Sequence, residues 1–376
     1  MKVGFVVDDS LDSTDGVQQY VLNLGKWMKR KGIDVHYLCG SSKRADLSGV
    51  HSLAKKIPVR FNNNRLTIPL PSSPRAIRQL LVKENFDVLH VQMPYSPMLA
   101  ARIVQLSPPH TAVVGTFHIA PYSRFHQAAA SVLGYVLRPN LRLFDAVFSV
   151  SSAAQETAKK TFKIDSMVLP NVVDYSAFRQ TNVKPSSQDN IVFLGRLVDR
   201  KGCLELLRGY DLLLRKLGTN TPTLVIAGDG PDRDKIETFI KKKSLTNKVK
   251  MLGRISEEAK GKILSSAKIA VFPSKGGESF GIVLIEAMAA GSGVVLGGNN
   301  PGYSEVLSSP NYIFNPKKPH EVAEVLEKYL HKDLRDDHRI QNEIMKKYDI
   351  DVVAPKIMAK YKTIIAKKTD ATHNKN

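Results

Sequence analysis

Short apolar runs alternate with longer amphipathic stretches along almost the whole chain, and this alternation restricts the fold more than any other feature. The run Lys2–Val7 is strand-like, residues 18–31 carry apolar side chains at helical spacing, and Val35–Cys39 is strand-like again. Further strands are predicted at Val88–Val91, Ala112–Thr116 and Ala146–Val150. Unbroken apolar strands separated by helices are typical of a parallel sheet covered by helices on both faces. The first half of the chain therefore predicts a doubly wound α/β domain.

The same rhythm starts again after a polar segment. Residues 171–190 lack sustained periodicity and contain a Pro-Ser-Ser sequence, which predicts a linker or a long surface loop. Beyond it, strands are predicted at Ile191–Leu194, Thr223–Ala227, Lys248–Leu252, Ile269–Pro273 and Gly293–Leu296. We therefore expect two Rossmann-like domains, over 1–172 and 186–350, facing each other across a cleft. The C-terminal helix and tail, 351–376, are expected to return to the first domain.

Length and cysteine content limit the protein class. A chain of 376 residues that is 43% hydrophobic can bury two cores, and only Cys39 and Cys203 occur, so no disulfide framework can form. No apolar run approaches the ~20 residues that cross a bilayer. The beginning of the chain resembles a strand rather than a secretion signal, so a cytoplasmic protein is expected.

The charge indicates an anionic partner. Lys and Arg number 55 against 35 Asp and Glu, a formal net charge of +20, which suits nucleic acid, anionic lipid or a phosphorylated ligand. No nucleic-acid-binding module is recognisable and aromatic residues make up only 7%, which argues against nucleic acid. Nine basic residues and one acid lie between Ser41 and Lys83, a net charge of +8. A helix beginning near Ser73, with Arg75 and Arg78 beside Ile77, predicts adsorption to an anionic membrane face; the alternative is a solvated basic face.

Candidate ligand-binding residues follow the predicted strands, because parallel α/β sheets bind ligands at the carboxyl ends of their strands. Gly16 and Gln18 open the first helix, and His118 follows the strand that ends at Thr116. Arg196 and Lys201 lie in a loop bracketed by glycines. Fixed cations beside exposed backbone amides suit a diphosphate.

The segment 276–291, GGESFGIVLIEAMAAG, is the most informative part of the chain. We expect Ser279 to cap a helix that runs from Phe280 for about ten residues and ends at Gly291. Glu278 and Glu286 would then lie ~12 Å apart along the axis, too far for the carboxylate pair of a glycosidase, which needs ~5–9.5 Å. The N–H groups of Phe280 and Gly281 would face a phosphate group between them.

These motifs resemble those of a known enzyme family. The spacing of Glu278 and Glu286 is similar to the Glu-x7-Glu motif of retaining glycosyltransferases of family 4, which have the GT-B fold, and His118, Arg196 and Lys201 follow in the same order. Over residues 2–310 the similarity is greatest to bacterial phosphatidylinositol mannosyltransferases. The chain departs from the family pattern at Asp15 and Val172, where glycines are usual.

The resemblance implies roles for individual residues. His118, Arg196, Lys201 and Glu278 would form the catalytic group, with the two cations on the donor diphosphate and Glu278 on the donor sugar. Glu286 would hold the ribose. The donor site would also include Gly16, Ser279, Phe280 and Gly281, and the acceptor would contact Gln18 and Arg65. No Asp-x-Asp loop and no His or acid cluster at metal spacing is recognisable, so no metal ion or other cofactor is expected beyond the nucleotide sugar.

The resemblance further implies retention of anomeric configuration, through front-side attack in which a leaving phosphate oxygen takes the acceptor proton. The expected reaction moves a hexose, mannose from GDP-mannose, to a lipid-linked acceptor such as phosphatidylinositol, with the protein peripheral on the inner membrane face. One alternative is a UDP-sugar-dependent glucosyl- or N-acetylglucosaminyltransferase acting on a soluble or polysaccharide acceptor. A sugar-nucleotide epimerase of similar shape is another.

Overall fold

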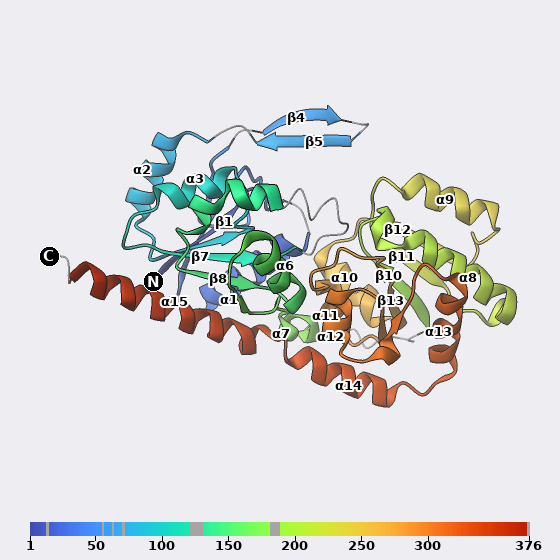
Figure 1. Cartoon of the computed structure of the whole chain (residues 1–376). Helices are drawn as coiled ribbons and strands as arrows, with labels where there is room; N and C mark the ends of the chain where they lie inside the picture. Colours follow the sequence, from blue (N-terminus) through green and yellow to red (C-terminus); the bar gives the residue numbers. More distant parts are fainter. Residues whose placement is uncertain are drawn as a thin grey trace. The chain divides into compact units, whose positions relative to one another are not determined.

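The computed structural model describes residues 1–12, 15–54, 56–61, 64–69, 72–119, 131–180 and 189–373 (Figure 1). The chain divides into two compact units, one formed by Met1–Val172 together with Val353–Asn376 and the other by Val173–Val352. Each unit is built around its own parallel sheet, so the predicted two-fold repetition of an α/β pattern is confirmed.

The sheet of the first unit has, within the described residues, seven parallel strands in the order β3-β2-β1-β6-β7-β8-β9. The order runs outward in both directions from the β1–β6 pair, which makes that pair the topological switch point. The central strands are buried almost throughout, as their unbroken apolar sequences predict. The strands are β1 (Lys2–Val7), β2 (Asp34–Cys39), β3 (Val50–Ser52), β6 (Val88–Gln92), β7 (Ala112–Phe117), β8 (Ala146–Ser149) and β9 (Met167–Val168).

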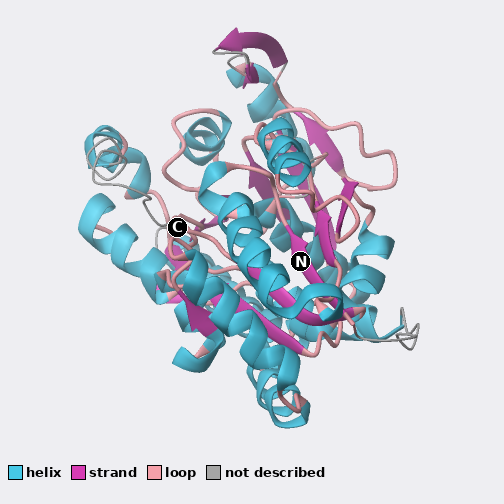
Figure 2. Ribbon diagram, turned by 90° about the vertical axis from the view of Figure 1, so that its right-hand side faces the viewer, coloured by secondary structure: helices cyan, strands magenta, loops and turns pink. Residues whose placement is uncertain are grey.

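Helices cover this sheet, and a separate hairpin projects from it (Figure 2). Helix α2 (Pro74–Glu84) begins at Ser73, whose side chain accepts a hydrogen bond from the Ala76 amide, and it buries Ile77 and Leu81 against the sheet. The other helices are α1 (Gly16–Arg30), α3 (Leu99–Leu106), α5 (Arg138–Leu141) and α6 (Ser152–Phe162). Strands β4 (Lys56–Phe61) and β5 (Asn64–Pro69) pair antiparallel, an element that the sequence did not predict.

The second unit repeats the plan with a sheet in the order β12-β11-β10-β13-β14-β15. Its strands are β10 (Asn190–Leu194), β11 (Leu224–Ala227), β12 (Val249–Gly253), β13 (Ala267–Phe272), β14 (Val294–Gly298) and β15 (Ile313–Phe314). Its helices are α7 (Tyr175–Gln180), α8 (Cys203–Leu217), α9 (Arg233–Lys242), α10 (Glu257–Ser265), α11 (Ile282–Ala289), α12 (Pro301–Leu307), α13 (Pro319–His331) and α14 (Arg335–Lys346). The order reverses between β10 and β13, so this pair is the switch point of the second sheet.

The last helix, α15 (Ile350–His373), is fastened to the first sheet by buried polar contacts. The Tyr361 hydroxyl lies 2.6 Å from His90 Nδ1, and His90 Nε2 lies 2.6 Å from the Thr116 hydroxyl. Near the end of the helix, Lys368 forms a 2.9 Å ion pair with Asp145. His90 is fully buried and has a structural role, because it links α15 to β7 through these two contacts.

The prediction of a linker over 171–190 is wrong for its first half. Val173 pairs with Asp349 in a β-bridge and residues 175–180 form α7, which contacts α11. Val172 and Val173 are both buried. The helix has only six residues, too few for a periodic pattern to stand out in the sequence. Residues 181–188 lie outside the described part of the chain.

In the part of the chain that the structure describes, no helix combines the length and the apolar character needed to cross a bilayer.

Candidate functional site

The switch point of the second sheet carries the basic loop and the glutamate segment singled out in the sequence. The loop after β10 contains Arg196, Arg200 and Lys201, and the loop after β13 contains Ser274 and Glu278. Because β10 and β13 are adjacent parallel strands, both loops leave the same edge of the sheet. The structure thus brings together two segments that are about 80 residues apart in the sequence.

Glu278 is the centre of this cluster. Its side chain is 10% exposed, and Oε1 lies 2.6 Å from the Arg200 guanidinium, 2.9 Å from Lys201 Nζ and 2.8 Å from the Ser274 hydroxyl. Burial alone would raise the pKa of Glu278, but the charges of Lys201 and Arg200 outweigh it and hold the pKa below its usual value. Arg200 and Ser274 both donate their hydrogen bonds to Oε1, which leaves Oε2 able to accept hydrogen bonds from a ligand.

Arg196 and Arg200, on the same loop, have different surroundings. Arg196 is exposed, and the described part of the chain offers its guanidinium no hydrogen-bond or ion-pair partner. Arg200 is half-buried and binds Glu278. Sequence reasoning missed Arg200, although its place next to Lys201 in a short turn between two glycines was a usable signal. One loop therefore carries Arg196, without a partner among the described residues, and two cations that pair with Glu278, Arg200 and Lys201.

The helix that follows Glu278 starts later than predicted. Helix α11 begins at Ile282, and the residue before it is Gly281, with φ = 105°, so the prediction that Ser279 caps a helix starting at Phe280 is wrong. A Cβ at Gly281 would collide with the ring of Tyr303, so the sharp turn requires glycine. Phe280 is 2% exposed and packs edge-to-face on Tyr348, which makes its side chain part of the core.

Glu286, on α11, is also buried and paired. Its side chain is 9% exposed, and Oε1 lies 2.5 Å from Lys260 Nζ. Burial would lower the pKa of Lys260, but Glu286 and Glu257 outweigh it and raise the pKa. Sequence reasoning missed Lys260, although it lies four residues before the buried Leu264, on the apolar face of α10.

His118 lies at the carboxyl end of β7 in the first unit. Its ring is 9% exposed, its Nε2 donates to the Gln92 side-chain oxygen at 2.7 Å, and the ring of Tyr20 packs against it edge-on. Burial lowers the pKa of His118 to about 3, so the imidazole is neutral at physiological pH. A neutral, oriented imidazole suits hydrogen bonding to a ligand better than the binding of an anion by charge.

Gln18 lies near the switch point of the first sheet, on α1, which opens at Gly16. Its Nε2 donates to the Ser10 carbonyl at 3.1 Å, while its Oε1 is buried and has no hydrogen-bond partner among the described residues. Asp8, at the end of β1, accepts from the Ala100 amide at 2.6 Å, and burial raises its pKa to about 6. The side chain of Arg65, on β5, lies outside what the structure describes.

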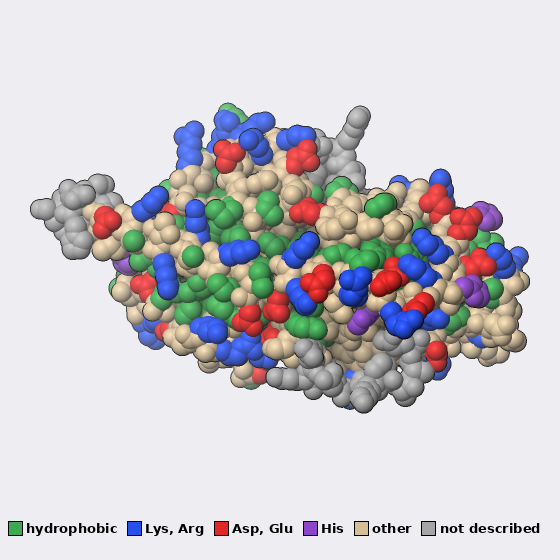
Figure 3. Space-filling model, turned by 90° about the horizontal axis from the view of Figure 1, so that it is seen from below, with side chains coloured by type: hydrophobic (Ala, Val, Ile, Leu, Met, Phe, Trp, Pro, Cys, Tyr) green, Lys and Arg blue, Asp and Glu red, His purple; other side chains and the backbone are tan. Residues whose placement is uncertain are grey.

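The basic stretch of the first unit has an exposed charged face on α2. Arg75, Arg78 and Lys83 are exposed, as is Val82, whereas Ile77 is fully buried. The predicted amphipathic helix is therefore present, and its apolar stripe packs on the sheet, so Ile77 is not available to a membrane surface. On the face drawn in Figure 3, by contrast, Lys and Arg side chains are interspersed with Asp and Glu.

Known proteins resemble the chain over both units. Residues 14–177 match the family model described as Glycosyltransferase Family 4, and residues 174–347 match Glycosyl transferases group 1. The phosphatidyl-myo-inositol mannosyltransferase of Mycolicibacterium smegmatis is 30% identical over 301 residues, 78% of this chain and 75% of that protein. The chain belongs to glycosyltransferase family 4.

A relative and a solved structure extend the similarity over nearly the whole length. The phosphatidyl-myo-inositol mannosyltransferase of Mycobacterium tuberculosis is 29% identical over 97% of both chains. Sucrose-phosphate synthase from Thermosynechococcus elongatus is 19% identical, with a TM-score of 0.72 over 97% of this chain and 99% of that one. This family 4 glycosyltransferase therefore has the GT-B fold, and the predicted family, fold class and enzyme class are confirmed.

Proposed function

We propose that this glycosyltransferase transfers mannose from GDP-mannose to phosphatidylinositol at an anionic membrane surface. The observation that carries the proposal is the 29% identity over 97% of both chains with a phosphatidyl-myo-inositol mannosyltransferase. The similarity spans both units, and so includes the elements proposed for the donor and those proposed for the acceptor.

The second unit holds the donor in this proposal. Arg196, which has no described ion-pair partner, and Lys201 bind the diphosphate. Glu278 accepts hydrogen bonds from sugar hydroxyls through Oε2, while Arg200 and Lys201 keep it ionised. Glu286, oriented by Lys260, accepts hydrogen bonds from the ribose. Ser279 and Gly281 complete the site through the turn that precedes α11, and Phe280 supports that turn from the core.

The first unit holds the acceptor and one contact to the sugar. The buried, unpartnered Oε1 of Gln18 accepts a hydrogen bond from an acceptor hydroxyl, which would satisfy an otherwise costly polar atom. Gly16 at the start of α1 permits close approach of the backbone, and Arg65 is kept as a proposed acceptor residue. His118 donates or accepts a hydrogen bond at the donor sugar as a neutral imidazole.

Transfer proceeds by front-side attack. The acceptor hydroxyl forms a bond to the anomeric carbon as the bond from that carbon to the phosphate oxygen breaks. The acceptor proton passes to the departing phosphate oxygen, and GDP leaves. Catalysis rests on positioning and on the cations of Arg196 and Lys201, which stabilise the negative charge that develops on the diphosphate.

Two measurements test the proposal. Thermal unfolding is recorded with GDP, UDP, ADP and their sugars, because a ligand at a hundred times its dissociation constant adds ~2.7 kcal/mol to stability. Transfer of labelled mannose is then followed to phosphatidylinositol in vesicles and to soluble polyols. Selective stabilisation by GDP and a labelled lipid product support the proposal. Stabilisation by UDP together with a labelled soluble product would favour the UDP-sugar alternative, and product formed without any acceptor would favour an epimerase.

A further inference from the structure

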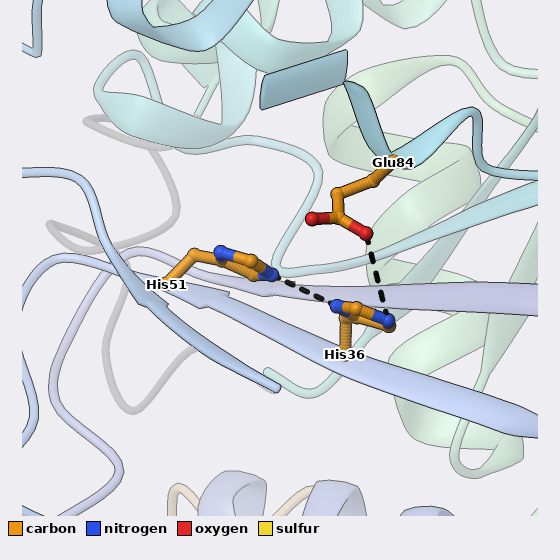
Figure 4. Close-up of side chains that lie close together, drawn as sticks. All are labelled: His36, His51 and Glu84. Atoms are coloured by element: carbon orange, nitrogen blue, oxygen red, sulfur yellow. Dashed lines mark hydrogen bonds and ion pairs between the residues drawn. The ribbon is translucent and has the colours of Figure 1, made fainter. Parts of the chain in front are cut away.

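Two histidines and a glutamate from three separate elements meet at the edge of the first sheet (Figure 4). His36 is on β2, His51 is on β3, and Glu84 is the last residue of α2. One imidazole nitrogen from each histidine and one carboxylate oxygen lie within 4.8 Å of one another. The sequence does not predict this cluster, because the three residues are spread over 49 positions with no regular spacing.

The two imidazoles are arranged to share one proton. Their rings are stacked with centroids 5.1 Å apart and an interplanar angle of 5°, and His36 Nδ1 lies 2.8 Å from His51 Nε2. Two nitrogens at this distance need either a proton or a cation between them, because their lone pairs otherwise repel. Tetrahedral Zn²⁺, with Zn–N bonds of ~2.0–2.1 Å, would separate them to ~3.3 Å, a change of about half an ångström.

The surroundings supply the features that accompany histidine ligation. The other nitrogen of His36, Nε2, lies 3.1 Å from Asp34 and 3.8 Å from Glu84, so a carboxylate can fix the ring through the nitrogen that faces away from His51. Lys2 binds Glu84 Oε2 at 3.1 Å. Lys2 and His36 both approach Glu84 through Oε2, so Oε1 is the oxygen that we assign to a metal ion.

Charge and accessibility also favour a cation. Asp34 and Glu84 against Lys2 leave one net negative charge among the groups in direct contact. The side chains of His36 and Glu84 are 13% and 12% exposed, so the site is sheltered yet open to solvent. Two imidazole nitrogens and one carboxylate are the donor set of Zn²⁺ and its late first-row neighbours, whereas Mg²⁺ and Ca²⁺ require oxygen ligands.

We propose that His36, His51 and Glu84 form a binding site for a divalent transition-metal ion, of the class of Zn²⁺. The ion takes the place of the shared proton between His36 Nδ1 and His51 Nε2. It joins the last turn of α2 to strands β2 and β3, and so fastens the segment between His51 and Glu84 at both ends. None of the three residues is among those proposed for donor or acceptor, and the inference does not depend on the reaction assigned to the enzyme.

The test is isothermal titration of the full, tag-free, metal-stripped chain with ZnCl₂, followed by titration with CoCl₂ monitored by visible absorption. We expect one Zn²⁺ per chain, a rise in Tm on addition of Zn²⁺, and a Co²⁺ spectrum of low coordination number. His51→Asn should weaken Zn²⁺ binding at least ~100-fold and abolish the Tm rise, since loss of even an outer-sphere partner costs ~10–100-fold. Glu84→Gln, at the end of α2, should weaken binding less, and it serves as the test if the first variant does not fold.

The matched control is His331→Asn, which removes an exposed histidine from α13 in the other unit. It should bind Zn²⁺ as the wild type does. Wild-type protein that takes up no Zn²⁺ at micromolar concentrations would overturn the proposal. So would a folded His51→Asn or Glu84→Gln variant with wild-type affinity, or a loss of binding in the His331→Asn control equal to that in His51→Asn.

Discussion

Single replacements of Arg196 and Lys201 distinguish two roles for the basic residues of this loop. Arg196 is proposed only to bind the ligand, whereas Lys201 also stabilises the fold through its ion pair with Glu278. Arg196 is exposed and has no described ion-pair partner, so Arg196→Ala should leave the free energy of unfolding unchanged. If its guanidinium stabilises the departing diphosphate, its loss costs ~2.7–4 kcal/mol in the transition state. At ~1.36 kcal/mol per factor of ten, kcat should fall ~100-fold or more.

Lys201→Ala should lower both turnover and stability. The substitution removes the 2.9 Å ion pair with Glu278, while Arg200 at 2.6 Å and Ser274 at 2.8 Å remain bound to the same oxygen. A hydrogen bond to a charged group contributes ~1.5–3 kcal/mol, and the remaining partners offset part of its loss. We therefore expect a measurable fall in the free energy of unfolding, by no more than ~3 kcal/mol, together with a loss of turnover of ~100-fold.

The assay combines steady-state transfer of labelled mannose with urea unfolding of each variant. Arg335→Ala, which removes an exposed arginine from α14, is the control and should change neither quantity. Near-normal turnover in both Arg196→Ala and Lys201→Ala, with the fold intact, would refute diphosphate binding by this loop. An equal loss of stability in the two variants would refute the distinction between the free and the paired cation.

Three further predictions concern the nucleotide, the membrane and pH. Glu286→Ala should weaken binding of both GDP and GDP-mannose, measured by titration calorimetry, whereas Glu278→Ala should impair sugar transfer and spare GDP affinity. Reversing Arg75 and Arg78 to Glu should release the protein from vesicles of anionic lipid in a co-sedimentation assay, since each basic residue near such a surface contributes ~1 kcal/mol, less as salt rises. The pKa of Glu278 is lower in the folded than in the unfolded state, where it is ~4.3, so ionised Glu278 stabilises the fold above that pH. In acid unfolding, the wild type should therefore lose its stability advantage over Glu278→Gln as the pH falls through the lowered pKa.

Each of these predictions has an outcome that contradicts it. If Glu278→Ala weakened GDP binding and Glu286→Ala spared it, the assignment of Glu278 to the sugar and Glu286 to the ribose would have to be reversed. Equally poor binding to anionic and zwitterionic vesicles at low salt would make the basic face of α2 a solvated one, and a soluble acceptor would then be favoured. Reversal of Arg335 and Arg339 on α14 is the control and should leave vesicle binding unchanged. A stability difference that persists after the pH has fallen below the lowered pKa of Glu278 would show that this residue acts in the fold through packing rather than charge.

The fold class could be read from the sequence because burial leaves a local imprint. A strand buried on both faces needs a continuous apolar run, and a helix that covers a sheet needs one apolar stripe, so β1, β6, β7 and their counterparts in the second unit stand out without any knowledge of contacts. The hairpin of β4 and β5 and the short helix α7 did not stand out, because their sequences carry neither pattern over enough residues.

The candidate site was only partly predictable, because partners in an ion pair need no fixed spacing along the chain. Glu278 and Glu286 were found through their own motif, but Arg200 and Lys260, which bind them, lie 78 and 26 positions away. Such a pair forms only where adjacent strands or packed helices bring distant loops together. The same holds for His36, His51 and Glu84, which share an edge of the sheet and no sequence pattern. The periodicity of the sequence thus determines which faces of the helices and strands are buried. The tertiary packing of those faces decides which charged side chains come together in the protein interior, where the low dielectric constant makes ion pairs strong.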